Sequence, residues 1–287
     1  MFALIRLLRP KQWVKNAFVC AGIVFGGHLH DSRLLIAVAL AVVAFSLMGS
    51  SVYVLNDYLD RESDREHPDK RRRPLASGAI TPAQGFTAAL CCFSASVVAA
   101  WLADGRVLAL VLVYLAINAA YSLRLKHQPV IDVFCISAGF MLRILAGTWG
   151  IHIPPSGWLL LTGMFLTLFL GFAKRRAEWM DAARSHSQRP VLSLYSAELL
   201  DTFLSIVATG TVLAYGLYTL DPQTIALHHT DKLIYTLPFV LFGLFRYLFL
   251  LHGQKKGENP SADVFTDPQI ILCGCAFSGF ALWLLNR

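Results

Sequence analysis

The chain has 287 residues, of which 56% are hydrophobic and only 15% are charged, and its formal net charge is +7. Soluble domains carry about 25% charged residues, so this composition excludes a cytosolic enzyme, a disordered tail protein and a secreted disulfide scaffold. The apolar residues come in blocks of roughly 16–22 residues, the length that a helix needs to cross a bilayer core. The sequence therefore predicts an all-α, polytopic membrane protein.

Nine membrane-spanning helices are predicted. In chain order they cover 16–28, 34–55, 82–103, 106–123, 130–150, 157–173, 197–219, 233–251 and 269–285. The first is the weakest, because its apolar part is short, contains glycine and follows basic residues as in a signal peptide. Since eight further spans follow, we expect it to remain in the mature protein. No connecting segment exceeds about 26 residues, so residues 1–287 are expected to form a single integral-membrane domain.

The basic residues predict the orientation of the chain. With the N-terminus inside, 19 Lys and Arg residues lie in inner segments and 4 in outer ones. This asymmetry follows the positive-inside rule. We therefore expect a multi-pass protein of the inner (cytoplasmic) membrane, with its N-terminus and its active site on the cytoplasmic side.

An acidic motif follows the second predicted span. Asp57, Asp60 and Asp64 are spaced i, i+3 and i+7, which places three carboxylates on one face of a helix that we expect to continue to Pro68. Asn56 stands beside them. Three like charges on one face repel each other, and a divalent cation would remove that conflict. Hard oxygen ligands suit Mg²⁺ bound through a diphosphate.

Two features near this motif leave alternatives open. The acidic residues could form a solvated helix end in which they pair with Arg61 and Arg65. The basic run at 70–73 could simply touch anionic lipid headgroups. Pro74 and Gly78, however, favour an ordered turn that folds these cations back over the carboxylates. Cations beside a metal-binding acidic cluster are what a bound polyphosphate needs.

The motif Asn-Asp-x-x-Asp-x-x-x-Asp at 56–64, at the end of the second of nine spans, resembles the UbiA superfamily of intramembrane prenyltransferases. In that superfamily the motif binds Mg²⁺ and the diphosphate of the donor. The resemblance implies a UbiA-like helical bundle with a cytoplasm-facing cavity. It also implies that Asp57, Asp60 and Asp64 are the metal ligands and that Mg²⁺ is the cofactor.

Further segments resemble one branch of the superfamily, the decaprenyl-phosphate phosphoribosyltransferases. They are RPKQWVKN at 9–16, HPDKRRRPLASG at 67–78, YSLRLK at 121–126, FRYL at 245–248 and GENP at 257–260. Many aromatic prenyltransferases of the superfamily carry a second motif, Asp-x-x-x-Asp, after the fourth span. Here Asp132 is followed four residues later by Ile136, and Arg124, Lys126 and His127 stand nearby. This departure favours the phosphoribosyl branch.

The branch implies transfer of a 5-phosphoribosyl group from 5-phosphoribosyl 1-diphosphate to a polyprenyl (decaprenyl-type) phosphate, with release of pyrophosphate. Mg²⁺ on the three aspartates would act as a Lewis acid. Lys70, Arg71 and Arg73 would stabilise charge on the leaving oxygen, so that Lys70 and Arg73 join the aspartates as catalytic residues. No strong general base is required, because a phosphate dianion is already a nucleophile. Ribosyl lipids of this type resemble precursors for cell-wall biosynthesis.

Two further phosphates, on the ribose and on the lipid, also need binding partners. The predicted substrate-binding residues are Lys15, Asn56, Arg71, Tyr121, Lys126, Asp132, Arg143, Lys174, Arg175, Glu178 and Arg246. Arg143 follows Asp132 by eleven residues, which is close to three helical turns or about 16 Å on the same face. A charge at that depth is a candidate for function. The alternatives are positive-inside anchors for the loop cations and a structural polar pair for Arg143.

Two other functions remain open. A UbiA-type prenyltransferase would move a prenyl group from prenyl diphosphate to an aromatic or lipid acceptor, and such a site needs fewer cations. A non-enzymatic carrier would bind anionic lipid through its basic loops, but this does not explain three carboxylates on one face. The expected partners are the two substrates and membrane lipids, with no nucleic acid, and a homo-oligomer is left open.

Overall fold

A computed structural model of the chain describes residues 2–66, 70–182, 190–253 and 267–285. Every element in these ranges is a helix, so the all-α prediction is confirmed. The first elements are α1 (Phe2–Leu8), η1 (Pro10–Cys20), α2 (Ala21–Phe25), α3 (Ser32–Leu59), α4 (Arg61–Glu66), η2 (Lys70–Arg72), α5 (Pro82–Ala103), α6 (Gly105–Leu123) and η3 (Leu125–His127). They are followed by α7 (Ile131–Ala146), η4 (Trp149–Ile151), α8 (Gly157–Ala182), η5 (Pro190–Leu194), α9 (Ala197–Leu220), α10 (Pro222–His228), η6 (Lys232–Thr236), α11 (Leu237–Gly253) and α13 (Pro268–Leu285).

Eight helical segments of the described residues are long and apolar enough to cross a membrane. They are Ser32–Leu59, Pro82–Ala103, Gly105–Leu123, Ile131–Ile151, Gly157–Met180, Ala197–Leu220, Lys232–Gly253 and Pro268–Leu285. They correspond to the second to ninth predicted spans. Large apolar side chains on them, such as Trp101, Phe245 and Leu272, are exposed, as expected where the surroundings are lipid.

The first predicted span, 16–28, is not a membrane-spanning α-helix in this structure. Residues Pro10–Cys20 form a 3₁₀ helix and only Ala21–Phe25 are α-helical. The segment packs closely against the backbone that follows α7. A Cβ atom on Gly22 would lie 1.9 Å from the carbonyl oxygen of Gly147, and one on Gly147 would lie 1.6 Å from that of Val19. The glycines are thus required by the contact between this segment and the residues that follow α7.

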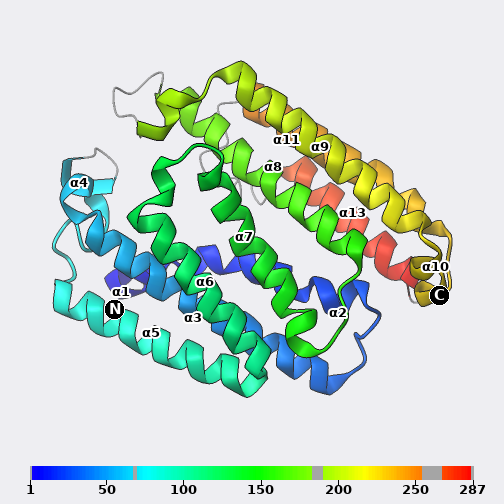
Figure 1. Cartoon of the computed structure of the whole chain (residues 1–287), viewed down its shortest axis with the longest axis horizontal. Coiled ribbons are helices and arrows are strands. Elements are labelled where there is room, and N and C mark those ends of the chain that lie inside the picture. Colours follow the sequence, from blue (N-terminus) through cyan, green and yellow to red (C-terminus); the bar gives the residue numbers. More distant parts are fainter. Residues whose placement is uncertain (1, 67–69, 183–189, 254–266, 286–287) are drawn as a thin grey trace. The chain divides into compact units, whose positions relative to one another are not determined.

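The chain divides into two compact units, residues 1–125 with 138–154 (unit 1) and residues 126–137 with 155–287 (unit 2). In unit 1, α3 packs along α5 and also contacts α6 and η1, around a core that includes Phe45 and Met48 (Figure 1). In unit 2, α8 packs along α9 and α11 along α13, with Phe169 and Leu250 in the core. The single domain over 1–287 stays a prediction.

Side-chain caps define where the long helices begin. Asp31 accepts hydrogen bonds from the first amides of α3, and Ser196 does the same for α9. At α5, Thr81 and Gln84 form a capping box, with Pro82 at the first helical position. These caps satisfy amide groups that lack a partner within the helix. They fix the position of α3, whose far end carries the acidic motif.

The contact between Gly147 and Val19 predicts a loss of stability on Gly147→Ala. The added Cβ would meet backbone atoms that cannot rotate away, and overpacking of this kind costs typically 1–3 kcal/mol or more. We expect a clearly lower midpoint of thermal unfolding in detergent. Gly274→Ala in α13 is the control, because a Cβ there meets nothing within 4 Å. Equal midpoints for the two variants would contradict the prediction.

Candidate active site

The acidic motif lies where α3 passes into α4. The helix does not run on unbroken, because α3 ends at Leu59 and Asp60 adopts a turn conformation before α4 begins. Hydrogen bonds from the Asp60 amide to the Asn56 carbonyl (2.9 Å) and from the Asp64 amide to the Asp60 carbonyl (2.8 Å) carry the helical pattern through this turn. The spacing predicted Asp57, Asp60 and Asp64 on one face. Asp57 and Asp64 do meet at one guanidinium, that of Arg73, and a common site that includes Asp60 stays a prediction. The expected end at Pro68 lies outside the described residues.

Two carboxylates of the motif are buried and share one guanidinium. Asp57 is 2% exposed and Asp64 is 3% exposed. The Nη1 atom of Arg73 donates to Asp57 Oδ1 at 3.1 Å and to Asp64 Oδ2 at 2.7 Å. Arg9 adds a second cation, with its Nη2 atom 2.5 Å from Asp57 Oδ1. Burial of a charge is costly unless it is paired, and these contacts supply the pairing.

The basic run returns to the carboxylates through Arg73, as the sequence predicted. The turn is closed by hydrogen bonds from the Arg73 amide to the Lys70 carbonyl and from the Ser77 amide to the Arg73 carbonyl, both 2.9 Å. Gly78, with φ of +77°, takes a left-handed conformation that suits glycine. Lys70 is half-buried on η2, whereas Arg71 is exposed. Roles of Lys70 and Arg71 toward a substrate stay predictions.

Among the described residues, Asp57 and Asp64 do not take up the alternative pairing with Arg61 and Arg65. Arg65 Nη1 lies 2.9 Å from Glu62 Oε2, and Arg61 Nε lies 3.3 Å from Glu62 Oε1. Arg65 also donates to the Ala76 carbonyl at 3.2 Å. These two arginines thus stabilise α4 and the following turn, and the buried carboxylates pair with Arg9 and Arg73.

The donor atoms of the motif have the right chemistry for Mg²⁺, which takes carboxylate oxygens. In the described part of the chain, however, no three His, Cys, Asp or Glu side chains are gathered closely enough to hold a metal ion. Asp57 and Asp64 are joined by Arg73, and Asp60 is half-buried on the turn between them. A metal ion at this site would therefore compete with Arg73 for the same two carboxylates.

Side-chain hydrogen bonds fasten η1 to α3. Trp13 Nε1 donates to Ser50 Oγ at 3.0 Å, and Asn16 Nδ2 donates to Ser46 Oγ at 2.7 Å. Ser50 in turn donates to the Leu8 carbonyl at 2.8 Å. These contacts explain why a polar, irregular segment packs against an apolar helix. They also bring the start of η1, and with it the adjacent Arg9, to the acidic end of α3.

Arg143 is buried, at 7% exposure, among neutral partners. Its Nε atom donates to Asn16 Oδ1 (2.6 Å), Nη1 to the Gly139 carbonyl (2.6 Å) and Nη2 to the Tyr114 hydroxyl (3.3 Å). Among the described residues it makes no ion pair with a carboxylate. The geometry is that of the structural alternative, in which Arg143 anchors the N-terminal segment. Contact with a substrate stays a prediction.

Lys15 lies in the electrostatic field of this arginine. Burial, and after it the positive charge of Arg143, lowers the pKa of Lys15 from its usual value to about 8. The ammonium group is therefore more easily deprotonated than that of an exposed lysine. A contact that was not predicted links α3 to α6 in unit 1, where Ser122 Oγ donates to Asn56 Oδ1 at 2.6 Å. Tyr121 precedes Ser122 and is half-buried.

In unit 2, four predicted substrate-binding residues pair with one another, namely Asp132, Lys174, Arg175 and Glu178. Asp132 and Arg175 are both 0% exposed, and Arg175 Nε donates to Asp132 Oδ2 at 2.5 Å. Arg175 also pairs with Glu178, and Lys174 Nζ lies 3.9 Å from Glu178 Oε1. Tyr195 was not predicted to lie here, and its hydroxyl donates to Asp132 Oδ1 at 3.0 Å. No motif surrounds that tyrosine, so nothing in the sequence pointed to it.

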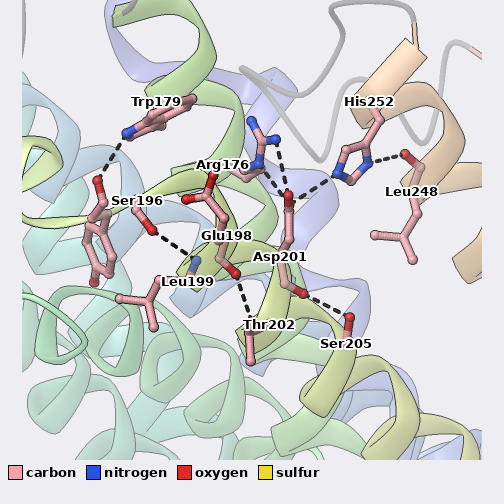
Figure 2. Close-up of polar contacts among 11 residues, drawn as sticks. Arg176, Trp179, Ser196, Glu198, Leu199, Asp201, Thr202, Ser205, Leu248 and His252 are labelled. Carbon is pink, nitrogen blue, oxygen red and sulfur yellow. Dashed lines mark hydrogen bonds and ion pairs between the residues drawn. The ribbon is translucent and has the colours of Figure 1, made fainter.

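A second ionic cluster in unit 2 was also missed. Figure 2 shows Arg176 on α8 and His252 on α11 beside the carboxylate of Asp201 on α9. Arg176 donates from Nε to Asp201 Oδ1 (2.8 Å) and from Nη2 to Oδ2 (3.2 Å), and His252 Nε2 lies 3.1 Å from Oδ1. The cluster joins three helices near their ends. Residues 174–176 are thus engaged with carboxylates rather than acting only as a positive-inside anchor.

The remaining predicted residues of unit 2 are Arg246 and Lys126. Arg246 pairs with Asp267, with Nη2 to Oδ2 at 2.9 Å and Nε to Oδ1 at 3.3 Å. Asp267 also caps α13 by accepting the amide of Ile270 at 3.0 Å. Lys126 is half-buried on η3. The GENP segment at 257–260 and the residues 67–69 lie outside the described residues.

Sequence comparison finds relatives along most of the chain. The model of the UbiA prenyltransferase family matches residues 16–266. The chain is 38% identical over 269 residues to the decaprenyl-phosphate phosphoribosyltransferase of Corynebacterium glutamicum, which covers 91% of this chain and 79% of that protein. It is 37% identical over 259 residues to the protein of the same name from Mycobacterium tuberculosis, which covers 88% of this chain and 85% of that protein.

Structural comparison agrees with this result. The fold is similar to that of a UbiA homologue from Archaeoglobus fulgidus bound to GPP and Mg²⁺, with a TM-score of 0.73. The match covers 99% of this chain and 100% of that one, at 17% sequence identity. At this identity the likeness concerns the fold alone.

The lowered pKa of Lys15 predicts a pH-dependent affinity for phosphate groups. Below pH 8 the cation is present, and it is lost as the pH rises through that value. The affinity for pyrophosphate, measured by calorimetry in detergent, should therefore fall between pH 7 and pH 9 by up to about tenfold, as for loss of a charge-assisted hydrogen bond. Lys15→Arg should flatten this dependence, since arginine stays charged.

Lys11→Arg is the matched control, because Lys11 lies exposed on the same 3₁₀ helix. It should keep the wild-type pH dependence. If Lys15→Arg and the wild type lose affinity equally between pH 7 and pH 9, Lys15 is not the titrating group.

Proposed function

Because the chain belongs to the UbiA prenyltransferase family, we propose that it is a phosphoribosyltransferase that acts on a polyprenyl phosphate. The donor is 5-phosphoribosyl 1-diphosphate, the acceptor is of the decaprenyl type, and pyrophosphate is released. The names of the relatives from Corynebacterium and Mycobacterium support this activity, since identity with them extends over most of the chain. Within the chain, the proposal rests on the buried aspartate pair bridged by Arg73.

The acidic motif would bind the donor diphosphate together with Mg²⁺. Asp57, Asp60 and Asp64 are the residues that would hold the ion. When bound, Mg²⁺ would stabilise the negative charge that develops on the leaving diphosphate. Arg9 and Arg73 lie at these carboxylates. Once Mg²⁺ occupied the carboxylates, both guanidinium groups would be released to donate to diphosphate oxygens.

The chemistry is a substitution at C1 of the ribose. An oxygen of the lipid phosphate forms the new bond to C1, while the bond from C1 to the diphosphate oxygen breaks and its electron pair leaves with pyrophosphate. No general base is needed, because the phosphate dianion is already a nucleophile. The task of the protein is to hold several phosphates close to one carbon, for which cations are the suitable groups.

The surroundings of Asp132 support ribosyl transfer over prenyl transfer. Asp132 stands where the second acidic motif of the aromatic prenyltransferases would begin, and Ile136 takes the place of its second aspartate. Both of its oxygens are engaged, Oδ2 by Arg175 and Oδ1 by Tyr195. A carboxylate neutralised in this way is poorly suited to bind a second metal ion. A site with a single acidic motif and additional cations fits a donor that carries a further phosphate.

The chain is an integral membrane protein, and we place it in the inner (cytoplasmic) membrane with its N-terminus and active site inside. The ratio of 19 inner to 4 outer basic residues supports this orientation. A cytoplasmic site is also where a soluble, highly charged donor would meet a lipid acceptor.

The proposed activity predicts transfer of label from 5-phosphoribosyl 1-diphosphate, carrying ¹⁴C in its ribose, to the organic phase when membranes also contain polyprenyl phosphate. EDTA should abolish the transfer, and added Mg²⁺ should restore it. Transfer of a prenyl group to an aromatic acceptor, without ribosyl transfer under matched conditions, would overturn the proposal in favour of the prenyltransferase alternative.

The aspartate pair predicts the effect of Asp57→Asn in the same assay. The substitution removes the charge that Arg9 and Arg73 share, and we expect activity to fall at least about 100-fold, as for loss of an electrostatic catalytic group. Asp31→Asn is the control at the opposite end of α3, because asparagine is an equally good N-cap. Comparable activity of the two variants, both correctly folded, would exclude the assigned role of Asp57.

A substitution of Lys126 separates two roles, that of a phosphate ligand and that of a positive-inside anchor. One charge-assisted hydrogen bond contributes about 1.5–3 kcal/mol, or roughly 10- to 150-fold in binding. Lys126→Gln should raise the Michaelis constant for a phosphorylated substrate by such a factor, with normal expression. Lys232 is exposed and lies on the predicted outer side of the membrane, so Lys232→Gln should leave this Michaelis constant unchanged. Kinetics of Lys126→Gln within about twofold of wild type would favour the anchor role.

A further inference from the structure

A strained residue immediately precedes α7. Among the described residues, four non-glycine residues have positive φ, namely Arg9, Val130, His152 and His229. Of these only Val130 is β-branched, and its φ of +67° lies in a region that such side chains rarely occupy. The turn that contains it connects η3, which carries Lys126, to the start of α7. Something in the structure must hold this turn against its own preference.

The Tyr195 hydroxyl is the group that contacts this residue. It accepts a hydrogen bond from the Val130 amide at 2.5 Å and donates one to Asp132 Oδ1 at 3.0 Å. One hydroxyl thus joins the strained residue to a buried carboxylate two positions later. Asp132 is itself fixed, because its other oxygen accepts from Arg175 Nε at 2.5 Å. All of these residues belong to unit 2.

Tyr195 is well placed to act as a fixed support. The side chain is 5% exposed, and its backbone carbonyl accepts a hydrogen bond from Trp179 Nε1 at 3.1 Å. Its own amide donates to the Leu192 carbonyl at 3.2 Å, at the end of η5. Burial raises the pKa of Tyr195 to about 12, so the hydroxyl keeps its proton and remains a donor to Asp132 at physiological pH.

We propose that Tyr195 is a positioning residue, whose hydroxyl holds Val130 in the left-handed conformation and thereby fixes the turn that carries Lys126. The inference rests on the proposed function, in which Lys126 binds a substrate phosphate. Tyr195 itself does not touch the reacting atoms. Its contribution is to offset the strain of the left-handed valine, so that the turn between η3 and α7 keeps the conformation that presents Lys126.

The proposal is tested by a double-mutant cycle between Tyr195→Phe and Val130→Gly. Tyr195→Phe keeps the ring and removes the hydroxyl, and the Michaelis constant for a phosphorylated substrate should rise by about tenfold, as for loss of one buried hydrogen bond. Val130→Gly alone should stay within about twofold of wild type, because glycine adopts positive φ without strain. The double variant should recover to within about threefold of wild type.

Rescue by glycine separates positioning from general packing. If Tyr195 only filled space in unit 2, removal of the valine side chain would add to the damage rather than repair it. Tyr215→Phe is the matched control, since this tyrosine is also buried in unit 2 and its hydroxyl bonds Thr236 at 2.6 Å, away from the turn. It should leave the kinetics unchanged. A double variant no better than Tyr195→Phe would overturn the proposal.

Amide hydrogen exchange of the peptide 128–134 gives a readout that needs no substrate. Tyr195→Phe should speed the exchange of this peptide at least severalfold by freeing the Val130 amide, while Tyr215→Phe should not. Faster exchange with unchanged kinetics would overturn the claimed link to Lys126. Unchanged exchange would overturn the hold on the turn itself. Absence of phosphoribosyl transfer by the wild-type protein would defeat the proposed function alone, and the exchange data would still decide the role of Tyr195.

Discussion

The shared guanidinium of Arg73 is the interaction on which the acidic site depends. Two carboxylates that are almost fully buried cannot both stay ionised side by side unless a cation lies between them. Nη1 of Arg73 reaches Asp57 and Asp64 at once, and Arg9 adds a second charge to Asp57. The same need for charge pairing accounts for the turn after α4, which returns the basic run to the helix end. It also accounts for the position of Arg9, which the hydrogen bonds of Trp13 and Asn16 to α3 bring to the acidic end.

Unit 2 satisfies the same requirement with different residues. Arg175 and Asp132 are both fully buried, and each keeps a further partner, Glu178 for the arginine and Tyr195 for the aspartate. Arg176 and Arg246 have carboxylate partners of their own. Breaking a buried pair is far more costly than its formation is favourable. The charged residues of unit 2 therefore join α7, α8, α9 and α11 to one another and α11 to the start of α13.

Much of this arrangement could be predicted from the sequence, because its causes are local. Apolar blocks of membrane length identified the eight long helices, and the i, i+3, i+7 spacing placed Asp57 and Asp64 on one side.

The contacts that escaped prediction join distant residues. Arg9 meets Asp57 across 48 positions and Tyr195 meets Asp132 across 63, and no local pattern links the two members of either pair. The first span was wrong, and the close backbone contacts of this segment, Gly22 with Gly147 and Gly147 with Val19, also join distant residues. Arg143 was recognised as unusual by its depth, but its neutral partners could not be deduced.

Unit 1 contains two neighbouring cations, Lys15 and Arg143, that repel each other. Beyond the paired arginines, the described residues place Lys15 and Arg143 close enough to influence each other electrostatically, and Arg143 has only neutral and aromatic partners. Two like charges in poorly solvated surroundings lower the stability of the folded protein. Functional sites are where proteins retain such conflicts. A ligand with several negative charges would relieve this repulsion, so the free energy lost in folding becomes available for binding. The proposed anionic donor would thus meet the positive charge of Lys15 and Arg143 in unit 1 in addition to the acidic motif.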